Sequence, residues 1–219
     1  MQATLTARSR LQLWLEFALL YIGIPVLMLM FLGQYSLFTT VWLLAAASMF
    51  LLWRTPGFKV SKLWQGFKWR DLRILAAFSL LTVICTFSTV LLVVPERFLD
   101  LPINRSGLWI MIMLLYPPLS AWPQEIIFRT LFFERYGVLF ANAKALIATN
   151  AVVFGFGHLF FQNPITIIMT GAAGAFMGWA YYKSGSLWLA WLLHSVGGMI
   201  VFTSGLGIFF YHGAIGATP

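Results

Sequence analysis

The chain has 219 residues, of which 61% are hydrophobic and 9% are charged, and its formal net charge is +8. Soluble domains carry roughly 25% charged residues, so this composition excludes a water-soluble protein. The excess of basic charge does not indicate a nucleic-acid partner. The basic residues flank apolar stretches, which is the distribution of an oriented membrane protein.

Seven apolar stretches are long enough to cross roughly 30 Å of hydrocarbon. The first follows Arg8 and Arg10 and is similar to a signal peptide, but no small-residue cleavage site follows it, so we interpret it as a retained membrane helix. The stretches cover residues 13–33, 36–53, 72–94, 107–133, 144–161, 165–182 and 186–207. They predict an all-α fold, a polytopic bundle of about seven transmembrane helices that has the lipid bilayer as a partner.

The lysines and arginines fall almost entirely on one side of these stretches. The other side has only Arg97 and Arg105. The basic side has Arg8, Arg10, Arg54, Lys59, Lys62, Lys68, Arg70, Arg73, Arg129, Arg135, Lys144 and Lys183. Because basic residues favour the cytoplasmic side, we expect the N-terminus inside and the C-terminus outside, in the cytoplasmic (inner) membrane of a bacterium.

Residues 54–73 form the only substantial polar loop. Aromatic and aliphatic residues alternate there with lysine and arginine, which is typical of a short amphipathic segment on the inner leaflet. A solvated basic loop with aromatic anchors is an equally good interpretation.

The sixth stretch has glycines at positions 171, 174 and 178. Small residues at helical spacing allow two helix backbones to approach closely. We therefore expect this helix to pack inside the bundle.

Ionisable residues at bilayer depth require an explanation, because each costs roughly 2.5–3.5 kcal/mol to insert. Four are deep in the predicted spans: Glu125 and Arg129 in the fourth, His158 in the fifth and His194 in the seventh. At about 1.5 Å per residue, Glu125, His194 and His158 lie about 15, 16 and 21 Å from the nearest basic residue at the cytoplasmic edge. Because these depths agree, we predict that the three side chains lie in one layer of the membrane. Alternatively, Glu125 and Arg129 only neutralise each other at i and i+4, and the histidines bond backbone carbonyls.

Three other polar or reactive residues are not assigned to the predicted site. Glu16 is near the start of the first span, from which it can reach the interface, and His212 falls in the C-terminal tail. Cys85 is interpreted as a small buried residue of a helix.

A carboxylate with two imidazoles can activate water, transfer a proton and stabilise an oxyanion. The same set, Glu125 with His158 and His194, is also a plausible site for a divalent metal. The sequence contains no HExxH motif and no GxSxG motif, so it lacks the usual signatures of helix-borne zinc proteases and serine hydrolases.

Three motifs in order resemble those of one family. Residues 124–129, QEIIFR, are similar to EExxxR; residues 154–158, FGFGH, match FxxxH; and His194 begins a copy of HxxxN. These are the motifs of the CAAX-protease and bacteriocin-processing intramembrane proteases, which include the Rce1-like enzymes.

The resemblance implies a helical bundle with a cavity open toward the cytoplasm and hydrolysis of a peptide bond in a protein or peptide substrate. It also implies that His158 activates water, that His194 supports the oxyanion, and that residues 124, 125 and 129 belong to the site. Two positions depart from the pattern. Gln124 replaces the first glutamate and Gly198 replaces the asparagine, so the resemblance leaves Glu125 as the substitute base.

The expected organisation is N-terminal transmembrane helices over residues 1–106, an Rce1-like catalytic-type core over 107–207 and a short extracytoplasmic tail over 208–219. The leading hypothesis is an intramembrane endopeptidase that cuts near the cytoplasmic face and needs no certain cofactor, with a divalent metal possible. One alternative is a non-catalytic membrane scaffold or binding protein of the same fold. Another is a small proton-coupled transporter, although no inverted repeat is visible.

Overall fold

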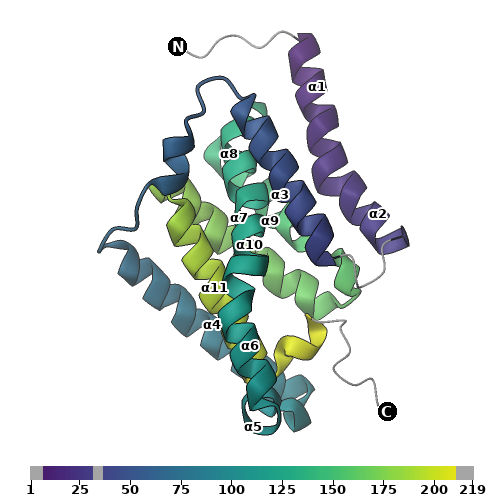
Figure 1. Ribbon diagram of the computed structural model, residues 1–219, viewed down its shortest axis with the longest axis vertical. Helices are drawn as coiled ribbons and strands as arrows, with labels where there is room; N and C mark the ends of the chain where they lie inside the picture. Colours follow the sequence, from purple (N-terminus) through teal and green to yellow (C-terminus); the bar gives the residue numbers. More distant parts are fainter. Residues whose placement is uncertain (1–6, 32–36, 211–219) are drawn as a thin grey trace.

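The computed structural model describes residues 7–31 and 37–210, with side chains described from Ser9 onward, and within these residues every regular element is helical. Residues 32–33 of the first predicted stretch, residue 36 of the second and residues 211–219 of the predicted tail, which include His212, lie outside the described residues. The all-α bundle predicted from composition is confirmed (Figure 1).

Helical elements occupy all seven predicted stretches. The first stretch holds α1 Ala7–Ala18, a π-helical segment Leu19–Gly23 and α2 Ile24–Phe31. The next three hold α3 Leu37–Trp53, α4 Asp71–Val93, and a continuous run of α6 Ser106–Tyr116, π-helical Pro117–Ala121, α7 Trp122–Glu125, π-helical Ile126–Leu131 and α8 Phe132–Arg135. The last three hold α9 Ala143–Phe156, α10 Pro164–Ser184 and α11 Leu187–Ser204.

Short elements connect these helices. They are the 3₁₀ turns Val60–Trp64, Pro95–Arg97, Gly137–Leu139, Leu159–Phe161 and Leu206–Phe209, together with the one-turn helix α5 Asp100–Asn104. Helix α5 and the start of α6 lie at the end of the bundle opposite the start of α1 (Figure 1).

Four helical segments are long and apolar enough to cross a membrane by length and composition: Ser9–Phe31, Asp71–Val93, Ala143–Phe161 and Leu187–Ser204. Helix α3 is apolar but has only 17 residues. Helix α10 is long enough, but its glycines and threonines lower its mean hydropathy. The chain is thus a multi-pass membrane protein, and the remaining three crossings stay a prediction.

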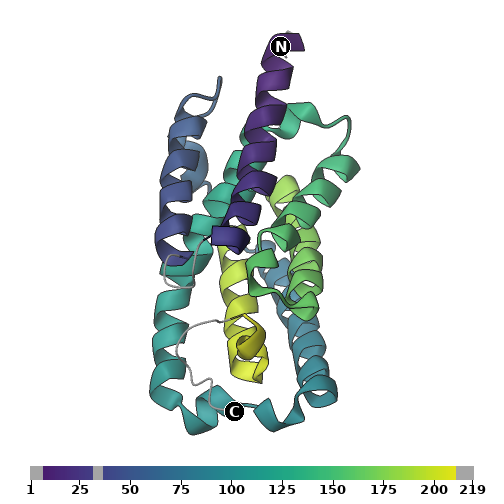
Figure 2. The same ribbon diagram turned by 90° about the vertical axis from the view of Figure 1, so that its right-hand side faces the viewer.

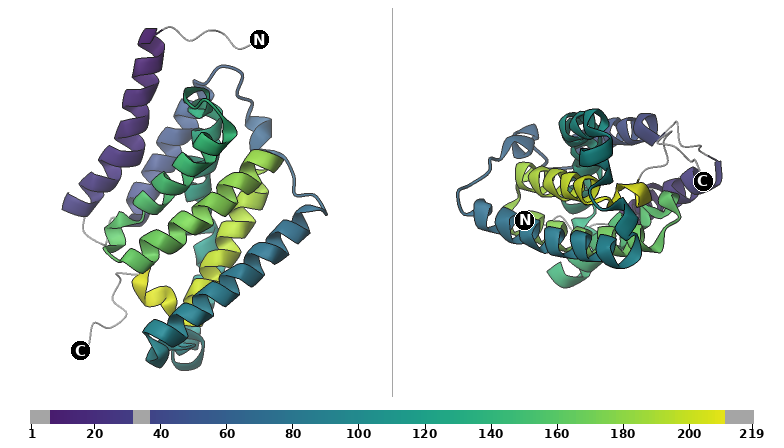
Figure 3. Two further views of the ribbon diagram at one scale, coloured as in Figure 1. Left: turned by 180° about the vertical axis from the view of Figure 1, so that it is seen from behind. Right: turned by 90° about the horizontal axis from the view of Figure 1, so that it is seen from below.

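Helix α11 occupies the centre of the bundle, and α1 and α4 stand at its edges (Figures 1, 2 and 3). In the span of α11 56% of residues are buried, against 17% in the span of α4. The outward leucines and isoleucines of α4 are not covered by the part of the chain that the structure describes, with Leu92 84% exposed, so they suit a lipid environment. Cys85 on α4 is exposed, which corrects the expectation that it is buried.

The glycines of α10 let α9 and α10 pack side by side (Figure 3). A Cβ added at Gly174 would lie 3.0 Å from the Phe154 ring, and one at Gly178 would lie 2.7 Å from Oδ1 of Asn150. The close helix approach expected from these small residues is confirmed for the contact with α9, whereas another face of α10 is uncovered, with Ile168 71% exposed.

The sequence suggested that the Glu16 side chain reaches the membrane interface. The structure corrects this expectation, because Glu16 is bound by other side chains of the protein. It forms an ion pair with Arg135 and accepts a hydrogen bond from the Tyr136 hydroxyl. Arg135 also donates to Thr55 Oγ1 at 3.1 Å. The carboxylate is therefore part of a network that joins α1, α3 and α8. A partner 119 residues away in the sequence supplies the counter-charge.

The polar loop before α4 is docked on the helices. Lys62 pairs with Glu134 at 2.6 Å, and the Ser186 hydroxyl donates to the carbonyl of Gln65 at 3.1 Å. Leu63 is buried, whereas Trp69 is 87% exposed. These contacts fix the loop beside the start of α11 and leave both interpretations of its outer surface open.

Candidate active site

The helix that carries the first motif is interrupted by two π-helical segments. Pro117 and Pro118 stand inside the helix, where proline cannot donate the usual backbone hydrogen bond and crowds the preceding turn. The wider turn at Pro117–Ala121 accommodates them, and a second wide turn follows at Ile126–Leu131. Such π-bulges are frequent at functional sites. They change the angular position of every side chain beyond them.

Neighbouring helices bond the carbonyls of the second wide turn. The Tyr21 hydroxyl donates to the Ile127 carbonyl at 2.7 Å, and the Asn150 side-chain amide donates to the Phe128 carbonyl at 2.6 Å. The turn is therefore held from the π-helical segment Leu19–Gly23 on one side and from α9 on the other.

Glu125 ends α7 and is completely buried. Its Oε1 lies 2.7 Å from Nδ1 of His194 on α11, and its Oε2 lies 3.4 Å from Nε of Arg129. The Arg129 guanidinium is also fully buried and lies over the Phe154 ring at 4.5 Å. The pairing at i and i+4 that the sequence suggested is thus present, but the carboxylate also holds a histidine.

His158 follows α9 and is held by its own helix. Its Nδ1 lies 2.8 Å from the Phe154 carbonyl oxygen. A carbonyl oxygen can only accept, so Nδ1 carries the proton and Nε2 is left with a free lone pair. The same argument applies to His194, whose Nδ1 faces Oε1 of a carboxylate that is paired with Arg129 through its other oxygen. Both imidazoles therefore have an Nε2 without a proton.

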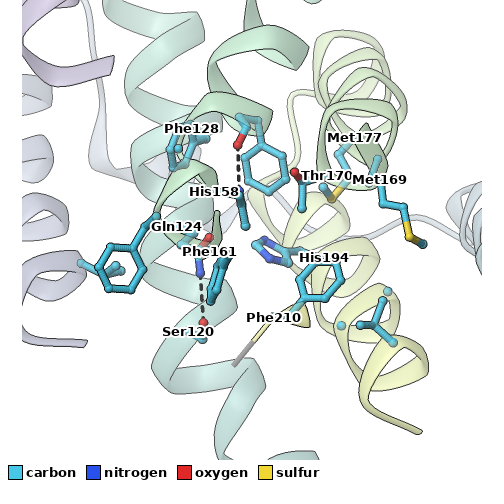
Figure 4. Close-up of a pocket in the computed structure, with 18 of the residues that line it drawn as sticks. Ser120, Gln124, Phe128, His158, Phe161, Met169, Thr170, Met177, His194 and Phe210 are labelled. Atoms are coloured by element: carbon cyan, nitrogen blue, oxygen red, sulfur yellow. Dashed lines mark hydrogen bonds between the residues drawn. The ribbon is translucent and has the colours of Figure 1, made fainter. Parts of the chain in front are cut away.

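The two histidines line one cavity of about 800 Å³ between the helices (Figure 4). The ring centroids of His158 and His194 lie 4.8 and 5.5 Å from that of Phe154, which stands between them. Most of the lining is apolar and comes from α2, α3, α4, α10 and α11. Its polar contributions are His158, His194, Tyr116, Ser120, Gln124, Ser48, Thr82, Thr89 and Thr170.

Glu125 and Arg129 are absent from this lining. The two histidines line the cavity directly, whereas Glu125 reaches it only through His194. Neighbouring residues on a helix point about 100° apart. The cavity side belongs to Gln124, whose amide donates to the Ser120 hydroxyl at 2.9 Å.

Among the described residues, no group of three or more His, Cys, Asp or Glu side chains is placed to hold a metal ion. The set considered for a divalent metal, Glu125 with His158 and His194, does not form such a group. The Glu125 carboxylate is engaged by Nδ1 of His194 and by Arg129, and Glu125 is not part of the cavity lining.

The sequence reasoning did not find Tyr116, Ser120, Asn150 and Tyr21, which line the cavity or hold its walls. Asn150 could have been found, since it stands eight residues before His158 in an apolar span. Tyr21 and Tyr116 are aromatic residues within apolar runs, and nothing in the sequence distinguishes them from core residues.

These observations define a class of protein. It is a multi-pass helical bundle in which two histidines face one cavity within the membrane. Residues 105–200 match the family model of the Rce1-like type II CAAX prenyl endopeptidases, which confirms the resemblance drawn from the motifs. The match runs from the start of α6 into the last third of α11 and includes all three motifs. No curated protein and no solved structure matches the chain.

Proposed function

We propose that this protein is an intramembrane endopeptidase that hydrolyses a peptide bond of a protein or peptide substrate near the cytoplasmic face. The Rce1-like match suggests endopeptidase activity in the membrane. The observation that carries the proposal is the 2.7 Å contact between the buried Glu125 carboxylate and Nδ1 of a histidine on the cavity wall. A carboxylate that fixes the tautomer of a histidine is the arrangement that prepares an imidazole for general-base catalysis.

In this proposal, His194 is the general base and Glu125 is a positioning residue. Nε2 of His194 takes a proton from water while the water oxygen bonds to the carbonyl carbon, and the carbonyl π pair moves onto its oxygen. Collapse of this intermediate breaks the C–N bond, and the imidazolium returns its proton to the departing nitrogen. The Glu125 carboxylate stabilises the imidazolium between the two steps, as an acidic residue does in serine proteases.

His158 has a different environment, because its Nδ1 proton goes to a neutral carbonyl and not to a carboxylate. A neutral acceptor stabilises an imidazolium less than a carboxylate does. We therefore assign His158 the task of accepting a hydrogen bond from the attacking water. This assignment moves the general-base role from His158, to which the family resemblance gives it, to His194.

Gln124 cannot take a proton from water, but its amide lies on the cavity wall and can bond a substrate backbone. We assign it to substrate binding. The same residue supports a second candidate function, because a site without the usual first glutamate could bind a peptide segment without cutting it. A membrane scaffold or binding protein of this kind would keep the cavity and lack hydrolysis.

The test uses the purified full chain in lipid vesicles with a defined library of synthetic peptides, in water enriched in ¹⁸O. Hydrolysis by the wild type should introduce one ¹⁸O atom into each new carboxyl group. We expect His194→Ala to reduce the rate by about 10²–10⁴-fold and His158→Ala to reduce it substantially. Asn104→Ala, at the far end of the bundle, is the control.

Two outcomes decide against the proposal. Binding of peptides without any ¹⁸O incorporation by the wild type would favour the non-catalytic function. Cleavage that survives His158→Ala, His194→Ala and Glu125→Gln alike would show that the reaction occurs elsewhere.

A further inference from the structure

Gly198 lies on the cavity wall and has no side chain. The space beside its Cα is filled by the side chain of Tyr116. Gly198 lies on α11 one turn after His194, and both residues line the cavity. A Cβ added at Gly198 would overlap the outer ring carbons and the hydroxyl of Tyr116. The phenol end of Tyr116 therefore occupies the space into which a side chain at position 198 would project.

Two indole hydrogen bonds hold the segment that carries Tyr116, the last residue of α6, against α11. Nε1 of Trp109 donates to Thr203 Oγ1 at 2.9 Å, and Nε1 of Trp191 donates to the Pro117 carbonyl at 2.8 Å. These bonds join α6 and the following π-helical segment to α11, one at Trp109 before Tyr116 and one at Pro117 directly after it. The backbone that carries Tyr116 is therefore held to α11 on both sides.

The ring of Tyr116 is also in contact with residues of α11. Its centroid lies 6.0 Å from that of His194, at an angle of 70°, and 5.6 Å from that of Phe202. The ring thus lies beside the proposed general base, and its hydroxyl lies at Gly198, one turn further along α11. In residues 7–31 and 37–210, no hydrogen bond to protein engages this hydroxyl, so its O–H is available to a ligand in the cavity.

We propose that the Tyr116 hydroxyl is the hydrogen-bond donor that stabilises the oxyanion during peptide hydrolysis. This inference rests on the proposed endopeptidase function and adds a catalytic residue to it. When the carbonyl π pair moves onto oxygen, the phenol O–H donates a hydrogen bond to that oxygen and keeps its proton. An ordinary tyrosine has a pKa near 10, so the donor is present at neutral pH.

The proposal also explains why position 198 holds glycine. Any side chain there would collide with the phenol, so a tyrosine at 116 and an asparagine at 198 exclude each other in this geometry. The hydrogen-bond donor is then Tyr116 of α6, and it replaces an asparagine at position 198 of α11. An oxyanion donor is aimed at the charge that develops in the transition state, so its removal lowers kcat far more than it weakens binding.

The first experiment compares Tyr116→Phe with the wild type in the peptide assay. Phenylalanine keeps the ring and its packing and removes only the hydroxyl. We expect kcat to fall by about 10²–10³-fold, the usual effect of losing one oxyanion donor, with KM nearly unchanged. Tyr182→Phe is the matched control, because Tyr182 is 47% exposed on α10 and is not part of the cavity lining.

The second experiment exchanges the donor between helices. Gly198→Asn alone should lower the detergent unfolding temperature, because the new side chain meets Tyr116. The double variant Tyr116→Ala with Gly198→Asn should recover that temperature and should cut faster than Tyr116→Ala alone. The unfolding temperature tests the spatial exchange independently of any activity.

The possible results separate this inference from the function on which it rests. A wild type that cleaves while Tyr116→Phe keeps its full kcat would overturn the role of Tyr116 and leave the endopeptidase intact. A wild type that cleaves no peptide would overturn the function and the donor role with it. Equal unfolding temperatures for Gly198→Asn and the wild type would contradict the exclusion between positions 116 and 198.

Discussion

Oε1 of Glu125 and Nδ1 of His194 lie 2.7 Å apart, although the two residues are separated by 69 positions in the sequence. Glu125 is completely buried and is flanked on its other oxygen by Arg129. The carboxylate thus has a cation on one side and an imidazole of the cavity on the other. Its charge is balanced in the resting site and can stabilise a second positive charge during a reaction.

The first prediction concerns this pair. Glu125→Gln removes the charge that would stabilise the His194 imidazolium, so kcat should fall by about 10²–10⁴-fold while KM changes little. If Glu125 acts through His194, the double variant Glu125→Gln with His194→Ala should be no slower than His194→Ala alone, because residues that act as a unit are not additive.

Gln124→Ala provides the comparison at the neighbouring position. It removes the amide on the cavity wall and leaves the Glu125–His194 pair intact, so it should reduce the rate much less than Glu125→Gln. Additive losses in the double variant, or a larger loss in Gln124→Ala, would contradict the positioning role of Glu125.

The second prediction concerns the packing of α9 on α10. A Cβ at Gly178 would lie 2.7 Å from Oδ1 of Asn150, whose amide holds the Phe128 carbonyl in the second wide turn. Gly178→Ala should therefore destabilise the protein by about 1–3 kcal/mol, as overpacking commonly does. Thermal unfolding in detergent measures the effect.

The control is Gly107→Ala, because no atom lies within 4 Å of a Cβ added at Gly107. The two substitutions add the same methyl group to a helix, so their difference reports the contact with Asn150. Unfolding temperatures that fall equally in both variants would show that this contact does not matter.

The third prediction concerns topology. If the excess of basic residues on one side sets the orientation, a reporter fused after Pro219 should read as extracytoplasmic. A reporter inserted in the loop at residues 54–73 should read as cytoplasmic, and one between α5 and α6 as extracytoplasmic. A cytoplasmic C-terminus would require an even number of crossings and would contradict the predicted seven.

The sequence by itself determined the class of the molecule. Composition required a membrane protein, and the apolar stretches located every long helix to within a few residues, because both properties depend on the local chain alone. The three motifs likewise placed Gln124, Glu125, His158 and His194 in the site region, and the match over residues 105–200 agrees with them.

Only the tertiary structure decided which of these side chains faces the cavity. Two π-helical segments, before and after Glu125, change the angular relation between residues, so an ideal period of 3.6 residues does not predict the orientation. The same holds for the Tyr116 phenol above Gly198 and for the pairing of Glu16 with Arg135. These contacts join residues far apart in the chain, and their geometry depends on how whole helices pack against one another.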